Sequence, residues 1–240
     1  MRLHIYKNAE ETTTALAEWI TSLISKTLET KEYFTIALSG GETPKKLYQK
    51  LASDDFREKI NWNKIHVFWG DERVVPFSDM NNNARMAFDN LLENINIPSA
   101  QIHPMQTDLA PDKSAKEYEK LLHVFFDKKE SSFDLVLLGL GDDGHTLSLF
   151  PGDRNLNDKT LWVKAIHSKE KGERITLMPC IVDKASAIAF LVTGENKAKV
   201  LQNILNKPDQ YNYPAQLIRP LNNEVHWFVD EGAGTFINSK

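Results

Sequence analysis

Polar and charged side chains gather in three short segments that contain glycine and follow apolar runs: residues 39–44, 70–73 and 139–145. The third segment contains Asp143 and His145. The ordinary pKa of histidine lies near neutrality, and a neighbouring carboxylate can fix the tautomer and orientation of the ring. The pair therefore predicts general-base chemistry, with His145 as the base and Asp143 as the group that orients it.

The segment Ser39-Gly40-Gly41-Glu42-Thr43-Pro44 could bind an anion. Its two glycines let the backbone approach a ligand, and Thr43 before Pro44 resembles the N-cap and first residue of a helix. The unpaired N–H groups of such a helix start would face a phosphate or a carboxylate. A plain strand-to-helix turn capped by Thr43 explains the segment equally well.

The glycines at 139, 141 and 144 formally match the G-x-G-x-x-G pattern of dinucleotide-binding loops. Asp142 and Asp143 would face the pyrophosphate in such a loop, and Pro151 would interrupt the helix that must follow. A Walker A motif is absent, and no H-E-x-x-H motif or histidine and cysteine cluster predicts a metal site. We therefore expect neither a cofactor nor a metal ion.

Two cationic residues are candidates for binding an anion. Arg174 begins a predicted strand, and Lys197 lies where a strand passes into a helix that runs to Leu205. A lysine in the first turn opposes the helix dipole, which favours a bound anion beside it. A solvated surface lysine is the alternative.

The remaining acidic and basic candidates are Asp71, Glu72 and Arg73. Arg73 could stabilise an oxyanion or position a substrate, whereas an acidic pair beside an arginine can also build a loop through ion pairs alone. We expect the other histidines to be surface or hydrogen-bonded core residues; they are His4, His66, His103, His123, His167 and His226.

Short apolar runs alternate with segments of helical period, as in βα units around a mostly parallel sheet. We predict strands at 34–38, 65–69, 133–138, 188–193 and 225–229, and further ones at 3–6, 162–166 and 174–177. We predict helices at 11–28, 44–51 and 114–126, and a connection at 94–107. The carboxyl ends of parallel strands share one edge, so we expect one crevice to collect the three polar segments.

Composition limits the class of protein. The 240 residues are 41% hydrophobic and 26% charged, which is enough for one α/β domain over residues 1–240. The net charge of −4 predicts no binding to nucleic acid or to an anionic membrane. Cys180 is the only cysteine and no apolar run is long enough to cross a bilayer, so we expect a cytoplasmic protein. The sequence does not indicate an oligomeric state.

Five segments, in order, resemble the 6-phosphogluconolactonase family, and residues 214–215 and 227–228 resemble its C-terminal signatures. The five are residues 39–44, 69–76, 139–152, 173–177 and 192–198. The resemblance implies a Rossmann-like three-layer α/β sandwich with a mostly parallel sheet, shared with glucosamine-6-phosphate isomerase. It also implies a cofactor-independent hydrolysis of 6-phospho-D-glucono-1,5-lactone in the oxidative pentose phosphate pathway.

The same resemblance assigns roles to residues. It implies that the catalytic residues are His145, Asp143, Arg73 and Asp71, and that the phosphate is bound by Ser39, Gly40, Gly41, Thr43, Arg174 and Lys197. The chain departs from the family pattern at Glu42, Asn82 and Leu147.

The related isomerase and deaminase enzymes carry an acidic residue five positions after the histidine. The corresponding residue here is Phe150, which cannot exchange protons. This difference favours lactone hydrolysis over isomerisation. A noncatalytic sugar-phosphate sensor and a dinucleotide-dependent oxidoreductase are the alternatives from other classes.

Overall fold

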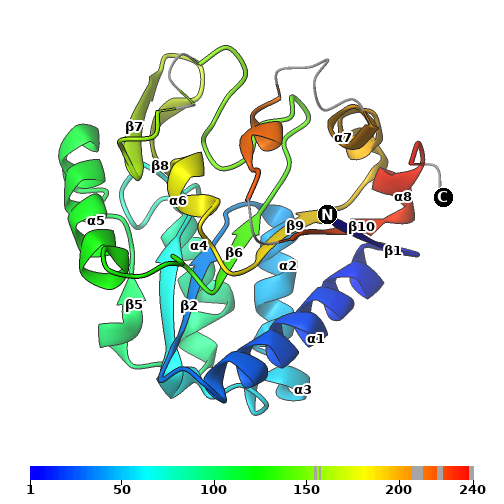
Figure 1. The fold of residues 1–240 in the computed structure, drawn as a ribbon, viewed down its shortest axis with the longest axis horizontal. Helices are drawn as coiled ribbons and strands as arrows, with labels where there is room; N and C mark the ends of the chain where they lie inside the picture. The colour runs from blue at the N-terminus through cyan, green and yellow to red at the C-terminus, as the bar shows by residue number, and fades with distance from the viewer. Residues whose placement is uncertain (154–155, 157, 207–212, 221–223, 238–240) are drawn as a thin grey trace.

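Seven parallel strands form the central sheet of the computed structural model, which describes residues 1–153, 156, 158–206, 213–220 and 224–237 (Figure 1). All neighbouring strands are parallel. In spatial order they are β1 (Arg2–Tyr6), β10 (Val225–Asp230), β9 (Ile188–Val192), β6 (Leu135–Leu138), β2 (Phe34–Leu38), β3 (Ile65–Trp69) and β5 (Ile102–His103). The expected mostly parallel α/β sheet is confirmed.

Strands β2, β6 and β9 are buried along their length, which explains why their sequences consist almost entirely of apolar residues. The predictions at 34–38 and 65–69 match β2 and β3 at both ends. The predictions for β1, β6, β9 and β10 differ from the observed bounds by one or two residues at one end. The prediction of a mere connection at 94–107 was wrong, because it contains β5. This strand has only two residues, too few to show a hydrophobic period.

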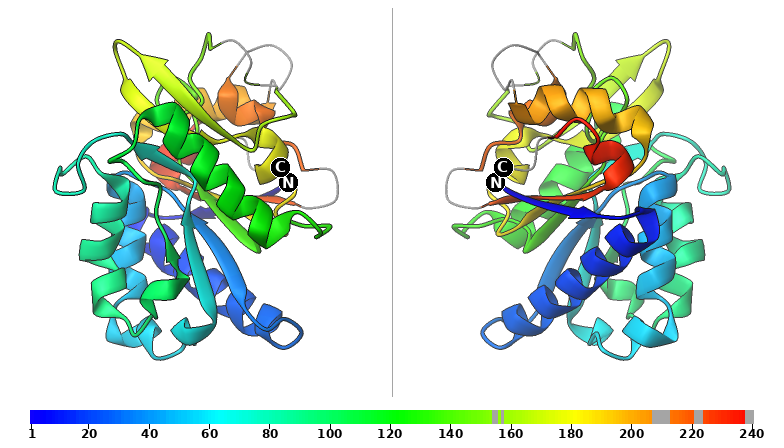
Figure 2. Two further views of the ribbon diagram at one scale, coloured as in Figure 1. Left: turned by 90° about the vertical axis from the view of Figure 1, so that its left-hand side faces the viewer. Right: turned by 90° about the vertical axis from the view of Figure 1, so that its right-hand side faces the viewer.

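Helices cover both faces of the sheet (Figure 2). On one side lie α1 (Ala9–Leu28), α2 (Glu42–Leu51), α3 (Asp54–Arg57) and α4 (Asn83–Asn90). On the other lie α5 (Pro111–Phe126), α6 (Pro179–Val182), α7 (Ala198–Asn206) and α8 (Glu231–Gly234). Single 3₁₀ turns are η1 (Trp62–Lys64), η2 (Leu92–Asn94), η3 (Ser99–Gln101), η4 (Glu195–Lys197) and η5 (Pro214–Leu217). The predicted three-layer sandwich is therefore confirmed.

Helix α1 shows why its sequence forms an amphipathic helix. Leu16, Ile20 and Ile24 are buried, and Trp19 and Leu23 pack partly buried against the same core. Asn8 caps its first turn by accepting a hydrogen bond from the Glu11 N–H at 2.9 Å. The predicted apolar face of this helix is confirmed.

The predicted start of α2 was wrong. The helix begins at Glu42, with Gly41 as N-cap, and no side chain caps it. Gly41 has φ +107°, a conformation that glycine adopts readily, so the chain turns into the helix two residues earlier than Thr43-Pro44 suggested. The Thr43 hydroxyl lies 3.4 Å from the Thr193 hydroxyl instead.

A second, antiparallel sheet consists of β4 (Asp71–Arg73), β8 (Gly172–Leu177) and β7 (Val163–Ser168). The strands predicted at 162–166 and 174–177 are confirmed, but they lie in this small sheet and not in the central one. It packs against α5. Because β4 follows β3 almost directly, the small sheet stands over the carboxyl ends of the central strands (Figure 1).

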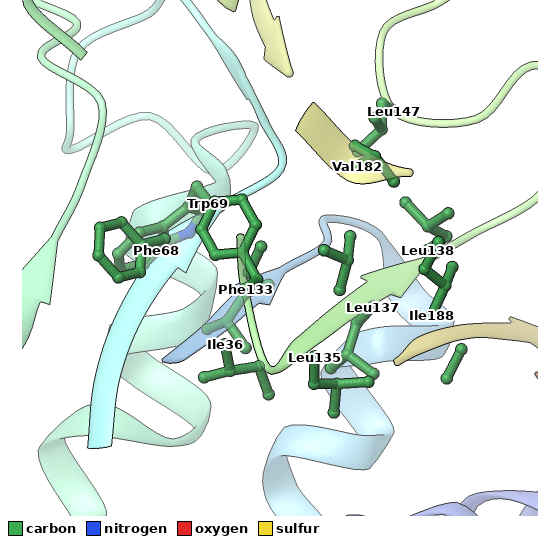
Figure 3. Packing of buried hydrophobic residues seen from close by; sticks show 14 of the residues in the cluster. Ile36, Phe68, Trp69, Phe133, Leu135, Leu137, Leu138, Leu147, Val182 and Ile188 are labelled. Atoms are coloured by element: carbon green, nitrogen blue, oxygen red, sulfur yellow. The ribbon is translucent and has the colours of Figure 1, made fainter. Parts of the chain in front are cut away.

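Aliphatic and aromatic side chains from adjacent strands fill the core. Figure 3 shows Ile36, Leu137 and Ile188 from three neighbouring strands. The ring of Phe68 packs edge-on against Phe133, with 5.4 Å between centroids. This packing fixes the strand ends from which the polar segments extend.

Glu72 joins the small sheet to the start of α4. Its side chain is fully buried and accepts hydrogen bonds from the backbone N–H groups of Arg73, Asn83 and Ala84, each at 2.7 Å. A carboxylate at a helix N-terminus is favourable, but burial disfavours its charge. Burial raises the pKa of Glu72 to about 7, against the three N–H groups, which lower it.

The raised pKa of Glu72 predicts a pH-dependent stability. The folded state holds the proton more tightly than the unfolded state, so the contribution of Glu72 to the free energy of unfolding falls between about pH 4.5 and pH 7. Glu72→Gln does not titrate. We expect the free energy of unfolding of the wild type, relative to that of Glu72→Gln, to fall by up to about 3 kcal/mol as the pH rises through this range.

Urea unfolding of both proteins at pH 5.0 and pH 7.5 measures this difference. Glu58→Gln is the matched control, because the Glu58 side chain is 81% exposed. The prediction would be contradicted if the free energy of unfolding of the wild type, relative to that of Glu72→Gln, stayed constant or grew with pH.

Candidate active site

A cavity of about 260 Å³ lies at the carboxyl ends of four adjacent strands, β9, β6, β2 and β3. The chain runs outward from β2 through β3 to β5, and then returns to the other side of β2 at β6. Ligands bind at such a reversal of strand order, because the connections on the two sides diverge and leave a crevice. The expected single crevice is present. The polar segments after β2, β3 and β6 all line it.

The segment after β2 is held rigidly by packing and hydrogen bonds. A Cβ atom on Gly40 would lie 2.0 Å from Asn83 Oδ1, so only glycine fits there. Tyr48 Oη donates to the Ser39 carbonyl at 2.6 Å and accepts from the Ser39 N–H at 2.9 Å. The backbone of Ser39, Gly40 and Gly41 therefore lines the cavity ahead of α2, an arrangement suited to an anion.

Asp143 and His145 form a direct pair. His145 Nδ1 and Asp143 Oδ1 are hydrogen-bonded, and the His145 N–H donates to the same oxygen at 3.1 Å. Burial opposes ionisation of Asp143, but the hydrogen bonds from His145 outweigh it and lower the pKa of this carboxyl. A proton on Nδ1 leaves the Nε2 lone pair available as a base. His145 lines the cavity, whereas Asp143 stands behind it.

The glycines of this loop make room for the Asp143–His145 pair and its neighbours. A Cβ atom on Gly141 would lie 2.0 Å from His145 Nδ1. Gly144 has φ +80°, and a Cβ atom there would lie 2.2 Å from Tyr213 Cδ1. Residues 139–150 contain turns and no helix. The G-x-G-x-x-G pattern therefore lacks the helix on which a dinucleotide pyrophosphate would bind.

Asp71 and Arg73 reach the cavity from β4. Ser148 Oγ donates to Asp71 Oδ2 at 2.7 Å, which fixes the carboxylate in a buried position. An Arg73 terminal nitrogen donates to the Asn81 carbonyl at 2.8 Å. Glu72, the middle residue of this strand, faces away from the cavity and accepts hydrogen bonds from the start of α4.

Arg174 does not line the cavity. It lies directly opposite Arg73 across the antiparallel pairing of β4 and β8. Burial and the positive charge of Arg73 lower the pKa of Arg174. Its Nε atom is buried and has no hydrogen-bond partner within the described ranges.

Lys197 lines the cavity from η4, in the turn that leads into α7. Its Nζ donates to Asp142 Oδ1 at 2.5 Å, and Asn196 Nδ2 donates to the same oxygen at 2.9 Å. The Lys197 side chain is 21% exposed, so it is not the solvated surface lysine of the alternative interpretation.

The structure also places residues in the cavity that the sequence analysis did not select. Asn83 lines it from the start of α4 and donates from Nδ2 to the Asp71 carbonyl at 2.9 Å. Thr193 lines it directly after β9. Thr193 follows an apolar run and precedes a glycine, the same signal that identified the other segments, whereas Asn83 carries no comparable signal.

The other histidines have partners elsewhere, and none lines the cavity. His4 and His226 interact at 3.2 Å, and His66 and His103 at 3.0 Å, each between ring nitrogens. His123 and His167 pair with acidic side chains. Across the described residues, no group of three or more histidine, cysteine, aspartate or glutamate side chains could hold a metal ion.

Phe150 lies beside His145. Its ring centroid is 5.0 Å from that of His145, at an interplanar angle of 50°. The position that carries an acid in the isomerases therefore presents an aromatic ring to the imidazole. Leu147, which lines the cavity with φ +54°, packs close to Gly70.

The sequence matches a family model described as glucosamine-6-phosphate isomerases/6-phosphogluconolactonase over residues 7–227. A 6-phosphogluconolactonase from Synechocystis is 41% identical over 227 residues, covering 90% of this chain and 89% of that protein. One from Haemophilus influenzae is 38% identical, covering 82% and 85%.

Solved structures agree with the sequence matches. The 6-phosphogluconolactonase of Trypanosoma brucei superposes with a TM-score of 0.86 at 27% identity, covering 99% of this chain and 98% of that one. A monomeric glucosamine-6-phosphate deaminase superposes with a TM-score of 0.83 at 19% identity, covering 98% and 99%, and shows the shared fold alone. The chain belongs to the glucosamine-6-phosphate isomerase/6-phosphogluconolactonase family.

Proposed function

We propose that this chain is a 6-phosphogluconolactonase, which hydrolyses 6-phospho-D-glucono-1,5-lactone to 6-phospho-D-gluconate in the oxidative pentose phosphate pathway. The observation that carries the proposal is that His145, paired with Asp143, lines the same cavity as Gly40 and Gly41, whose backbone is suited to an anion. The similarity to curated 6-phosphogluconolactonases over most of the chain supports it.

In the proposed reaction, the substrate phosphate binds to the backbone of Ser39, Gly40 and Gly41, to the Thr43 hydroxyl and to Lys197. This anchoring orients the lactone carbonyl toward His145. Nε2 of His145 takes a proton from a water molecule as its oxygen attacks the carbonyl carbon. Asp143 keeps the ring oriented and stabilises the imidazolium that forms.

The tetrahedral intermediate then collapses as the bond between the carbonyl carbon and the ring oxygen breaks. The proton held by His145 passes to that leaving oxygen, which stays attached to the product through the sugar chain. Arg73, on the cavity wall, is the proposed group that stabilises the oxyanion. No covalent intermediate with the protein is needed.

Arg174 and Asp71 have supporting roles in this proposal. Arg174 lies beside Arg73 on the neighbouring strand, so in this proposal it adds to the positive potential at the cavity without lining it. Asp71, held by Ser148, is placed to accept a hydrogen bond from a sugar hydroxyl group or to orient Arg73.

The cellular setting is a further part of the proposal. We infer a cytoplasmic enzyme, because Cys180 is the only cysteine and the substrate is a phosphorylated sugar. Among the described residues, no helix is long and apolar enough to span a bilayer.

The direct test offers the purified protein freshly generated 6-phosphogluconolactone and, separately, glucosamine 6-phosphate, both with EDTA present. We expect rapid lactone hydrolysis and no release of ammonia, because Phe150 replaces the acid that the isomerases use. Hydrolysis that chelation abolishes and zinc restores would contradict the metal-free mechanism. Ammonia release would favour the deaminase reaction instead.

Replacing the proposed base should reduce turnover. For His145→Ala we expect kcat to fall roughly 10²- to 10⁴-fold, with little change in the affinity for 6-phosphogluconate. Asp143→Asn should cause a smaller loss, because it misorients the ring without removing it. The measurement is the enzyme-dependent rate at saturating lactone, after subtraction of spontaneous hydrolysis.

His123→Ala is the matched control for His145→Ala, since His123 lies on α5 and pairs with Asp127 outside the cavity. It should keep the wild-type rate. Near-normal turnover of His145→Ala would exclude this histidine as the base and direct attention to Asp71.

Lys197 should account for the preference for a phosphorylated substrate. A charge-assisted hydrogen bond to phosphate contributes roughly 1.5–3 kcal/mol. We therefore expect Lys197→Ala to raise KM for the phosphorylated lactone and to leave the slow hydrolysis of unphosphorylated gluconolactone unchanged. Lys199→Ala is the control, because Lys199 points to Gln202 on α7. An unaltered preference in Lys197→Ala would remove Lys197 from the phosphate site.

A further inference from the structure

The cation proposed for phosphate binding already has an anion of the protein beside it. Asp142 extends from the loop after β6, and its Oδ1 atom accepts hydrogen bonds from Lys197 Nζ at 2.5 Å and from Asn196 Nδ2 at 2.9 Å. Lys197 lines the cavity, and Asp142 does not. The lysine that faces the cavity is therefore neutralised from outside it.

The two partners of this ion pair differ in their freedom to move. The Lys197 side chain is 21% exposed, whereas the Asp142 side chain is 68% exposed. Turning Asp142 toward solvent rehydrates its carboxylate, whereas withdrawing Lys197 would disrupt packing along the cavity wall. A ligand that needs Lys197 would therefore displace Asp142 and leave the lysine in place.

A phosphate group has the chemistry to make this exchange. A dianionic phosphate offers three acceptor oxygens and more charge than one carboxylate, and Lys197 is one of several donors around the cavity. Asp142 does not line the cavity, whereas Gly40 and Gly41 do, so a phosphate in the cavity could add the backbone N–H groups of these glycines to its contact with Lys197. Exchange thus replaces a single ion pair by a fuller set of contacts.

We propose that Asp142 is an internal counter-anion for Lys197, displaced by the ligand phosphate, and that it thereby sets how tightly the enzyme holds phosphorylated ligands. This inference rests on the proposed function, because it takes Lys197 as a phosphate ligand. In this role Asp142 determines specificity, since it acts through Lys197 and does not line the cavity.

An internal competitor has a direct consequence for the reaction. Substrate and product carry the same phosphate, so Asp142 weakens the binding of both by the same factor. A lysine without Asp142 would hold the product more tightly and slow its release. Ligands without a phosphate group do not need Lys197, and their affinity should not depend on Asp142.

The test measures the Kd of inorganic phosphate and of 6-phosphogluconate by calorimetry for the wild type and for Asp142→Asn. The asparagine keeps the size of the side chain and an acceptor for Asn196, and removes the charge. We expect binding about two- to five-fold tighter in Asp142→Asn at low ionic strength, with a smaller gain in 0.5 M NaCl. Gluconate, which has no phosphate, should show no gain.

Two comparisons separate the ion pair from a general change in charge. Glu195→Gln removes one negative charge from the same 3₁₀ turn, and Glu195 does not line the cavity. An equal gain in that variant would overturn the proposal. In a Lys197→Ala background, Asp142→Asn should give no gain, and a persisting gain would also overturn it.

The opposite role for Asp142 gives the opposite result. If the carboxylate held Lys197 in position for phosphate, Asp142→Asn would bind both ligands more weakly, which would refute the competitor role. These binding measurements do not depend on turnover. A wild type without lactonase activity would therefore overturn the proposed function, while tighter phosphate binding by Asp142→Asn would still support the ion-pair exchange.

Discussion

The geometry of parallel strands is the constraint on which the site depends. Strands β9, β6, β2 and β3 run in one direction, so their carboxyl ends meet at one edge. The reversal of strand order between β2 and β6 opens that edge into a cavity. Segments that are 100 residues apart, such as those of Gly40 and Gly141, therefore line the same space. The apolar core holds this arrangement, because the strands beneath are buried on both faces.

Close packing around glycine gives the site its precision. Gly40 leaves space for Asn83, and Gly141 leaves space for the His145 ring. A side chain at either position would displace the group that it faces. Tyr213 packs against Gly144 in the same manner, which ties the C-terminal part of the chain to the loop after β6. In this protein the glycines of the loops serve contacts within the protein as well as the approach of a ligand.

The ionisable groups of the site have hydrogen-bond partners within the protein. Asp71 is bound by Ser148, Asp143 by His145, and Lys197 by Asp142. Such pairs reduce the cost of placing ionised groups in a partly dry cavity. They also decide which groups a ligand can reach without rearrangement. In the proposed reaction His145 offers Nε2 to a water molecule, whereas Lys197 exchanges Asp142 for the phosphate.

The sequence alone determined the α/β class, because each buried strand appears in it as a short apolar run and each half-buried helix as apolar residues at helical spacing. It also located Asp143 and His145, since they are two residues apart and one loop brings them together. The contacts of Asn83 with Gly40 and of Lys197 with Asp142 were decided by the tertiary structure, because strand order sets both. The position of Arg174 opposite Arg73 depends on the pairing of β4 with β8, which no local pattern encodes. The sequence thus specified the chemical groups, and long-range pairing specified their neighbours.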